Sequence, residues 1–148
     1  LGLPIAFSPF GIGQILLAFL LLHFITGLSI SLVFQTAHIM PEVSFPQANE
    51  NGVVEGERML HQLATTSNYS ENSPLFSWMI GGLNYQVEHH LFPDICHVHY
   101  RNIAPIVKAT AAEFNIPYYT KKTFFDALKA HANMLYQLGR LEVQPVKA

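Results

Sequence analysis

The segment from Gly81 to Pro93, GGLNYQVEHHLFP, carries the side chains best suited to chemistry. If its middle is helical, successive residues turn by about 100°, and Gln86, His89 and His90 fall within one arc of the helix. Glu88 then points away. Neutral imidazole is a good ligand for iron, zinc or copper, and two adjacent histidines near a third polar group can hold one metal or bridge two. The spacing alone leaves two interpretations open, a metal site and ordinary surface or interface histidines.

A long uncharged stretch precedes this segment. Residues 1–41 contain no Asp, Glu, Lys or Arg, and Ile12 to Phe34 is predominantly apolar. At about 1.5 Å per residue, the apolar stretch covers a hydrocarbon core of about 30 Å. We interpret it as a transmembrane helix, with a buried core helix as the alternative. A signal peptide would need a basic start and a shorter apolar core, and the sequence has neither.

Two histidines belong to this apolar region. His38 lies about one turn beyond the predicted span, so it can share a site with His89 and His90. Ionisable residues in or beside a membrane are costly, and they are therefore often functional. His23 lies within the span, where a hydrogen bond between helices explains it as well as a metal does. His38 is therefore the third candidate ligand.

Proline, glycine and polar residues mark the expected turns, loops and helix ends in the rest of the first hundred residues. Pro4 and Pro9 indicate that residues 1–10 are the tail of an earlier span or a re-entrant turn. Residues 41–73 read as a polar connector. Ser73 followed by Pro74 predicts a helix start with a capping hydroxyl, and the glycines at 81 and 82 predict where that short helix ends.

Two amphipathic helices are predicted after residue 100. The first covers Asn102 to Phe114, with Ile103, Val107 and Phe114 on one face, and Pro117 stops it. The second begins at a capping box made by Thr123 and Asp126 and closes at Gly139. Its expected apolar stripe consists of Phe124, Leu128, Leu135 and Leu138. The predicted fold class is all-α and integral to the membrane, with residues 1–35 as a transmembrane segment and residues 36–148 as a mostly helical region.

Composition excludes several classes of protein. Of the 148 residues only 12% are charged, and one is a cysteine, so a disulfide framework and a cysteine-based zinc site are excluded. The net charge of −2 is not the basic excess that is typical of a nucleic-acid-binding protein. Basic residues concentrate after residue 100, which by the positive-inside bias predicts that the region after the span faces the cytoplasm. The chain starts on Leu1 rather than Met, so we expect a piece of a longer protein.

Together these segments carry a family resemblance. GGLNYQVEHHLFP, followed by HVHYRNIAPIVKATAAEFNIPYY, resembles the third histidine box and C-terminal tail of the membrane fatty acid desaturases. The form Q-x-x-H-H is similar to the front-end or acyl-lipid branch of that family. The upstream HQLATTSNYS and the run from Gln35 to His38 resemble the same family and occur in the same order. The resemblance covers nearly the whole chain.

The resemblance implies an enzyme that uses O2 and two irons to remove hydrogens from adjacent methylenes of a fatty acyl chain, carried as acyl-CoA or acyl-lipid. It implies His89 and His90 as catalytic metal ligands and His38 as an additional one. Gln86 takes the place that a histidine holds in other branches, so it is implied either as a ligand or as a partner of one. The cytoplasmic region would then carry part of a histidine-rich di-iron site. Electrons would come from a b-type cytochrome or a ferredoxin.

Three further residues are candidates for substrate contact or for ordering the metal ligands. His61 lies in a polar stretch that resembles the family's motif near substrate entry, and a capping or loop role is its alternative. Asn84 lies within the third-box segment. His97 follows Pro93, so its helical register with His89 is broken and a surface role is its alternative.

The family's first two boxes, H-x-x-x-H and H-x-x-H-H, do not occur in this sequence. Three ligands cannot fill the coordination shells of two irons, so we expect the 148 residues to be inactive alone and to form the C-terminal part of a larger desaturase. Two alternatives stay open. One is an acyl hydroxylase or related oxygenase of the same superfamily, and the other is a non-catalytic membrane fragment.

Overall fold

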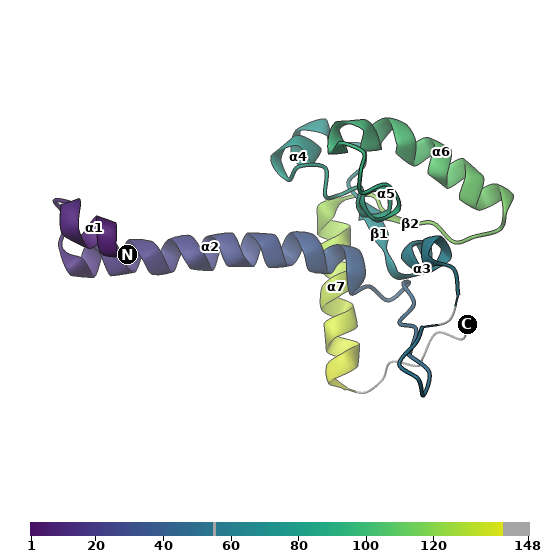
Figure 1. Ribbon diagram of the computed structural model, residues 1–148, viewed down its shortest axis with the longest axis horizontal. Coiled ribbons are helices and arrows are strands. Elements are labelled where there is room, and N and C mark those ends of the chain that lie inside the picture. The colour runs from purple at the N-terminus through teal and green to yellow at the C-terminus, as the bar shows by residue number, and fades with distance from the viewer. Residues whose placement is uncertain (55, 141–148) are drawn as a thin grey trace. The chain divides into compact units, whose positions relative to one another are not determined.

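The computed structural model describes residues 1–54 and 56–140 and is mostly helical. The chain divides into two compact units, Leu1–Leu32 and the residues from Val33 onward. Figure 1 labels the elements of both units. All the predicted ligands belong to the second unit, so the site can be described within it.

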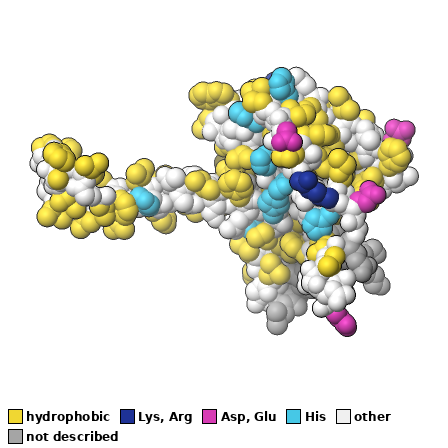
Figure 2. All heavy atoms as spheres, viewed as in Figure 1, with side chains coloured by type: hydrophobic (Ala, Val, Ile, Leu, Met, Phe, Trp, Pro, Cys, Tyr) yellow, Lys and Arg dark blue, Asp and Glu magenta, His cyan; other side chains and the backbone are white. Residues whose placement is uncertain are grey.

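The first unit contains α1, Gly2–Phe7, and most of α2, Ile12–His38. Among the described residues, α2 is the one helix long and apolar enough to cross a membrane. Its large side chains are uncovered, since Leu20 and Leu22 are each 63% exposed and Phe24 is 67% exposed. Figure 2 shows hydrophobic side chains over this unit. A surface of this kind suits a hydrocarbon environment and is costly in water.

Two polar side chains in the apolar part of α2 bond to the backbone of the same helix. Ser29 Oγ donates to the carbonyl of Ile25 at 2.8 Å, and Nδ1 of His23 lies 2.9 Å from the carbonyl oxygen of Phe19. Local bonds of this type let polar residues sit in an apolar helix without a partner on another helix. His23 therefore needs no metal to explain it.

The second unit begins with the last residues of α2 and contains the remaining helices. The structure places α3 at Arg58–Thr65, within the stretch predicted to be a connector. That prediction was wrong there because α3 has only eight residues and is polar on average, although its few apolar side chains share one face. The helix α4, Pro74–Met79, begins at the predicted proline.

The ends of α4 differ in how well they were predicted. Ser73 precedes the helix, but its hydroxyl makes no capping bond; instead its carbonyl accepts a hydrogen bond from Ser77 Oγ at 3.0 Å. Gly81 and Gly82 end the segment with φ of +64° and +73°. Residues with a Cβ rarely adopt this left-handed backbone conformation, whereas glycine adopts it readily. The glycine pair can therefore end the helix.

The structure contains one small sheet that the all-α prediction missed. β1, Ser67–Tyr69, pairs in parallel with β2, Tyr119–Lys121, with Asn68 opposite Thr120. Three residues are too few to show the period-two pattern of a strand. The pairing nevertheless matters, because it joins parts of the chain about fifty residues apart.

The last two long helices are close to their predicted ranges, but their buried faces differ from the predicted ones. α6 covers Tyr100–Glu113, after a short 3₁₀ turn η1 at His97–His99, and buries Tyr100, Ala104 and Ala111 while Phe114 lies 65% exposed. α7 covers Phe124–Gly139. Its capping box is present as predicted, since Thr123 and Asp126 bond reciprocally.

The face that α7 buries is displaced by one residue from the predicted stripe. Ala127, His131 and Met134 are buried, whereas Leu135 and Leu138 are 47% and 44% exposed. The predicted stripe was chosen from the largest apolar side chains, so the prediction did not include Ala127 and His131 in the core. Nδ1 of His131 lies 2.9 Å from the carbonyl oxygen of Ile39, which ties α7 to the residue that follows α2.

The main core of the second unit surrounds the end of α2. It consists of Ala37, Met40, Val43, Tyr69 and Ala127, all fully buried. The aromatic rings of Tyr69, Phe76 and Phe124 pack together with centroids 5.1 to 6.2 Å apart. Packing of this type fixes the end of α2, and with it the position of the His38 side chain.

Candidate metal centre

The helix α5, Gln86–Leu91, carries the predicted box. The spacing argument for QVEHHL applied if this segment was helical, and the structure shows that it is. Gln86, Val87 and Glu88 are buried, and His89 and His90 are partly buried. Because Gln86 and His90 are four residues apart, their side chains share one face of this single-turn helix.

His38, at the end of α2, meets that face of α5. Nε2 of His38 lies 3.3 Å from Nε2 of His90, and Nε2 of Gln86 lies 3.4 Å from the first and 3.3 Å from the second. The three nitrogens form a nearly equilateral triangle, which we call the His38–Gln86–His90 triad. Two nitrogens bound about 2.1 Å from one metal lie about 3.0 Å apart at a right angle and about 3.4 Å apart at a tetrahedral angle. The triad has this spacing.

The hydrogen bonds within the triad depend on the tautomers of the two histidines. If the Gln86 amide donates to both rings, the lone pairs of the two imidazoles face each other across 3.3 Å. A shared cation would stabilise that arrangement. The buried Oε1 of Gln86 has no hydrogen-bond partner in the described part of the chain, and a 180° rotation of the amide would turn this oxygen toward the rings. Two imidazoles and an amide oxygen are a donor set that iron accepts.

Burial and nearby charges favour the neutral form of His90. Burial lowers the pKa of His90 to about 4, and the neighbouring charges of His38, His89 and Arg58 act in the same direction. A metal ligand must offer an unprotonated nitrogen, so a lowered pKa leaves the His90 side chain ready to ligate at neutral pH.

His89 points elsewhere. Its ring centroid lies 5.6 Å from that of His90, and its Nδ1 lies 3.4 Å from the hydroxyl of Tyr100. Gln86, His89 and His90 were expected to face one point. Gln86 and His90 do so, together with His38, but His89 does not. Within residues 1–54 and 56–140, no three His, Cys, Asp or Glu side chains lie together as a metal-binding group. The triad is compatible with this because one member is an amide.

A buried polar network lies on another side of α5. Glu88 is fully buried and accepts hydrogen bonds from Asn68 Nδ2 at 2.7 Å and from the Tyr118 hydroxyl at 2.9 Å. Burial raises the pKa of Glu88, and these two bonds oppose the rise. Burial also raises the pKa of Tyr118, as do the nearby charges of Glu88 and Glu71.

Sequence reasoning assigned no role to this network. Glu88 does point away from the histidines, as expected, but it points into the protein. The available signal was that Glu88 is the one Asp, Glu, Lys or Arg in residues 81–93, and a carboxylate is rarely buried without partners. Those partners, Asn68 and Tyr118, come from distant segments that no local pattern connects to α5.

The three weaker candidates lie outside the triad. His61 lies on α3, and its carbonyl accepts a hydrogen bond from Thr65 Oγ1 at 2.8 Å. Asn84 is buried, and its Nδ2 lies 2.9 Å from Ser77 Oγ. His97 is exposed on η1, where its Cβ lies so close to Gly82 that a Cβ at that glycine would be 3.0 Å away.

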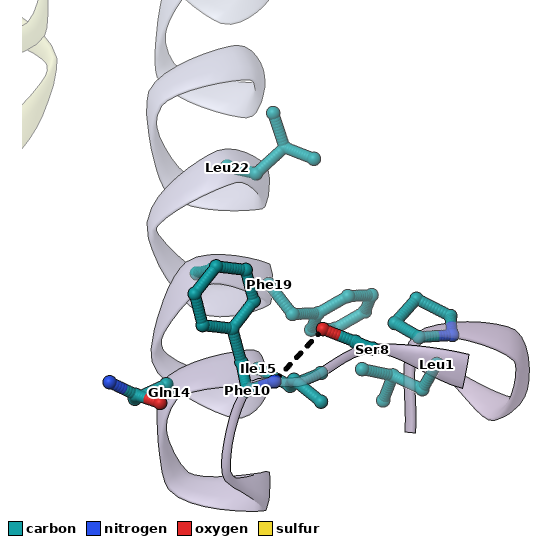
Figure 3. A pocket seen from close by; sticks show the side chains of 9 residues that line it. Leu1, Ser8, Phe10, Gln14, Ile15, Phe19 and Leu22 are labelled. Atoms are coloured by element: carbon teal, nitrogen blue, oxygen red, sulfur yellow. Dashed lines mark hydrogen bonds between the residues drawn. The ribbon is translucent and has the colours of Figure 1, made fainter. Parts of the chain in front are cut away.

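The first unit contains a pocket of its own, with a volume of about 290 Å³. It lies between α1 and the start of α2, and Figure 3 shows its side chains, including the Ser8 hydroxyl that accepts from the Phe10 backbone N–H at 3.2 Å. The lining is largely apolar: Leu1, Pro4, Ser8, Phe10, Gln14, Ile15, Ala18, Phe19 and Leu22. None of the predicted site residues lines it.

Comparison with known proteins gives this geometry a context. Residues 1–122 match the family described as fatty acid desaturase. The chain is 41% identical to an acyl-lipid (8-3)-desaturase of Physcomitrium patens over 95% of its length, and 36% identical to one of Mortierella alpina over 92%. It is 34% identical to an sn-1 linoleoyl-lipid 6-desaturase of Synechocystis sp. over 94% of its length.

The matches cover only part of each relative. The chain spans 29%, 30% and 39% of the length of these three proteins. No solved structure matches the chain significantly. The family match includes α2, α5 and β2, and so every residue of the triad and its supporting network. The chain therefore belongs to the fatty acid desaturase family.

Proposed function

We propose that the chain is the C-terminal part of a membrane-bound fatty acid desaturase that introduces a double bond into an acyl-lipid or acyl-CoA. The observation that carries this proposal is the triad, in which His38 from the end of α2 meets Gln86 and His90 from α5 at 3.3 to 3.4 Å. Family membership supports it, and so do the relatives, several of which are named acyl-lipid desaturases.

In this proposal His38, His90 and Gln86 hold iron, and His89 is a further ligand from the same helix. Bound iron would supply the oxidising power to take two hydrogens from adjacent methylenes, while O2, two electrons and two protons become two molecules of water. The chain contributes imidazole nitrogens, an amide oxygen and the spacing between them. Four donors do not complete two iron shells, so the remaining ligands would come from other parts of the enzyme.

The proposal extends to membrane topology and to electron supply. The region after α2 would face the cytoplasm, because seven of the eight Lys and Arg residues lie after residue 100. A b-type cytochrome or a ferredoxin on that side would deliver the electrons.

Product analysis in cells tests this function. The complete protein containing this chain is expressed as wild type, as His90→Ala and as His99→Ala, and cellular fatty acids are identified by gas chromatography with mass spectrometry. His99 is a matched control because it is exposed on η1 and lies outside the triad. We expect a new double bond with wild type and His99→Ala, and none with His90→Ala.

Two results would contradict the proposal. A hydroxylated acyl chain as the sole product would indicate an oxygenase of the same superfamily. An unchanged double-bond product from His90→Ala would show that the triad holds no catalytic metal, as expected of a non-catalytic fragment.

A further inference from the structure

The helix α5 cannot hold its own orientation. It has six residues, and its N-cap residue, Tyr85, makes no capping hydrogen bond. Helices this short are unstable alone, because nucleation costs more than one turn of hydrogen bonds returns. The position of Gln86 and His90 must therefore be set by whatever holds the rest of α5, which means the buried residues Val87 and Glu88.

Asn68, on β1, holds both of these residues. Its Oδ1 accepts the backbone N–H of Val87 at 2.9 Å, which is one of the donors that the start of a helix leaves without a partner. Its Nδ2 donates to Oε2 of Glu88 at 2.7 Å. Asn68 is fully buried, and Figure 1 shows β1 beside α5. One side chain thus fixes both the start of α5 and its buried carboxylate.

Tyr118 holds the other oxygen of that carboxylate. Its hydroxyl donates to Oε1 of Glu88 at 2.9 Å and accepts from Asn68 Nδ2 at 2.7 Å. Tyr118 immediately precedes β2, which pairs with β1, so the strand pair sets the separation of Asn68 and Tyr118. Each oxygen of the Glu88 carboxylate thus accepts a hydrogen bond, one from Asn68 on β1 and one from Tyr118, the residue before β2.

We propose that Asn68, Glu88 and Tyr118 are positioning residues that orient α5, so that Gln86 and His90 meet His38 at ligating distance. This inference rests on the proposed function, because it gives the triad its role as a metal centre. Gln86 and His90 flank Val87 and Glu88 on a single turn, so a rotation of α5 at the Glu88 side would displace both ligands. Partners of metal ligands typically change metal affinity by about 10- to 100-fold when they are removed.

Two adjacent tyrosines allow a matched test. Tyr118→Phe removes the hydroxyl that bonds Glu88, whereas Tyr119→Phe makes the same change where the hydroxyl has no hydrogen bond within the described residues. The complete enzyme is purified in detergent, and iron affinity, the visible spectrum of the cobalt-loaded protein and the thermal midpoint are measured. We expect Tyr118→Phe to fold, to bind iron about 10-fold more weakly and to change the cobalt spectrum. Tyr119→Phe should match wild type in all three.

A second pair of variants separates positioning from folding. Glu88→Gln keeps the length of the side chain and one acceptor oxygen, whereas Glu88→Ala leaves Asn68 and Tyr118 without their partner. We expect Glu88→Gln to restore most of the iron affinity that Glu88→Ala loses. Wild-type iron affinity and cobalt spectrum in both Tyr118→Phe and Glu88→Ala would overturn the inference while leaving the proposed function intact. A wild-type enzyme that binds no iron would overturn the proposed function itself and, with it, this inference.

Discussion

At the scale of single residues, the triad combines two imidazoles with an amide. Gln86 is 2% exposed and its Oε1 has no partner among the described residues, so the side chain is buried at a cost that another contact must offset. A metal ion accepting that oxygen is the contact that the geometry favours. Gln86 is therefore the residue whose substitution is most informative.

Substitution of Gln86 tests whether the amide is a ligand. Gln86→Leu keeps similar bulk but offers no donor, and Gln86→Glu offers a carboxylate, which iron accepts. We expect Gln86→Leu to lower iron per protein at limiting iron by about 10-fold and Gln86→Glu to retain it. Metal analysis of the purified complete enzyme checks both. Equal iron in Gln86→Leu and wild type would show that the amide only packs beside the metal.

At the scale of elements, short segments hold the site together. α5 and the two strands have six, three and three residues, and each depends on contacts from elsewhere in the chain. The end of α2 is fixed in the same way. The hydroxyl of Tyr69, on β1, donates to the carbonyl of Val33 at 2.8 Å, and its ring packs in the core beside Ala37. β1 thus holds both helices that contribute to the triad.

Tyr69→Phe isolates the hydrogen bond between β1 and α2. The ring and its packing remain, and the loss of one hydrogen bond costs about 1 kcal/mol of stability. In the complete enzyme we expect the thermal midpoint to fall by about 1 °C, because the shift per kcal/mol decreases as a protein becomes longer. Tyr136→Phe is the control, since that side chain is 55% exposed, and its effect should stay within about 0.5 kcal/mol. Equal midpoints in Tyr69→Phe and wild type would show that packing alone fixes the end of α2.

The capping box of α7 offers a test confined to one helix. Thr123→Ala removes the oxygen that accepts from the Asp126 N–H at 3.1 Å, at a cost of about 1 kcal/mol. Amide hydrogen exchange in the first turn of α7 should then be about 5-fold faster, as read by mass spectrometry of the complete enzyme. Thr110→Ala, at an exposed position within α6, should leave exchange in α7 unchanged. Unchanged exchange in Thr123→Ala would mean that tertiary packing, rather than the cap, limits opening of this helix.

The sequence allowed prediction of those features that a local pattern encodes. The long apolar helix, the proline at the start of α4 and the capping box at Thr123 all depend on residues within one segment. Features that depend on distant residues were missed. β1 and β2 pair across about fifty residues. Asn68, on β1, and Tyr118, just before β2, both bond to Glu88. The histidine types and their spacing led to the prediction of a metal site with His38, Gln86, His89 and His90, and the fold brings His38, Gln86 and His90 within 3.4 Å of one another.

At the scale of the whole molecule, the chain combines a helix long enough to cross a membrane with a polar region that follows it. The charged residues all lie after residue 41, outside the apolar stretch, which is expected of a protein at the boundary between lipid and water. One member of the triad directly follows the apolar stretch, because His38 is the last residue of α2. An iron centre there would lie at the edge of the membrane, where an acyl chain can approach from the apolar side.

This placement predicts which side of the membrane Cys96 faces. Cys96 is exposed and is the single cysteine of the sequence, so it reports on the region after α2. In sealed vesicles with the cytoplasmic face outward, a membrane-impermeant maleimide should label the peptide containing Cys96 equally with and without detergent. Cys96→Ser should abolish that label. In the variant Ser29→Cys, the new cysteine lies within α2 and should stay unlabelled until detergent is added. Labelling of Cys96 only after detergent would place the triad on the opposite side, and a cytoplasmic electron donor could not reach it.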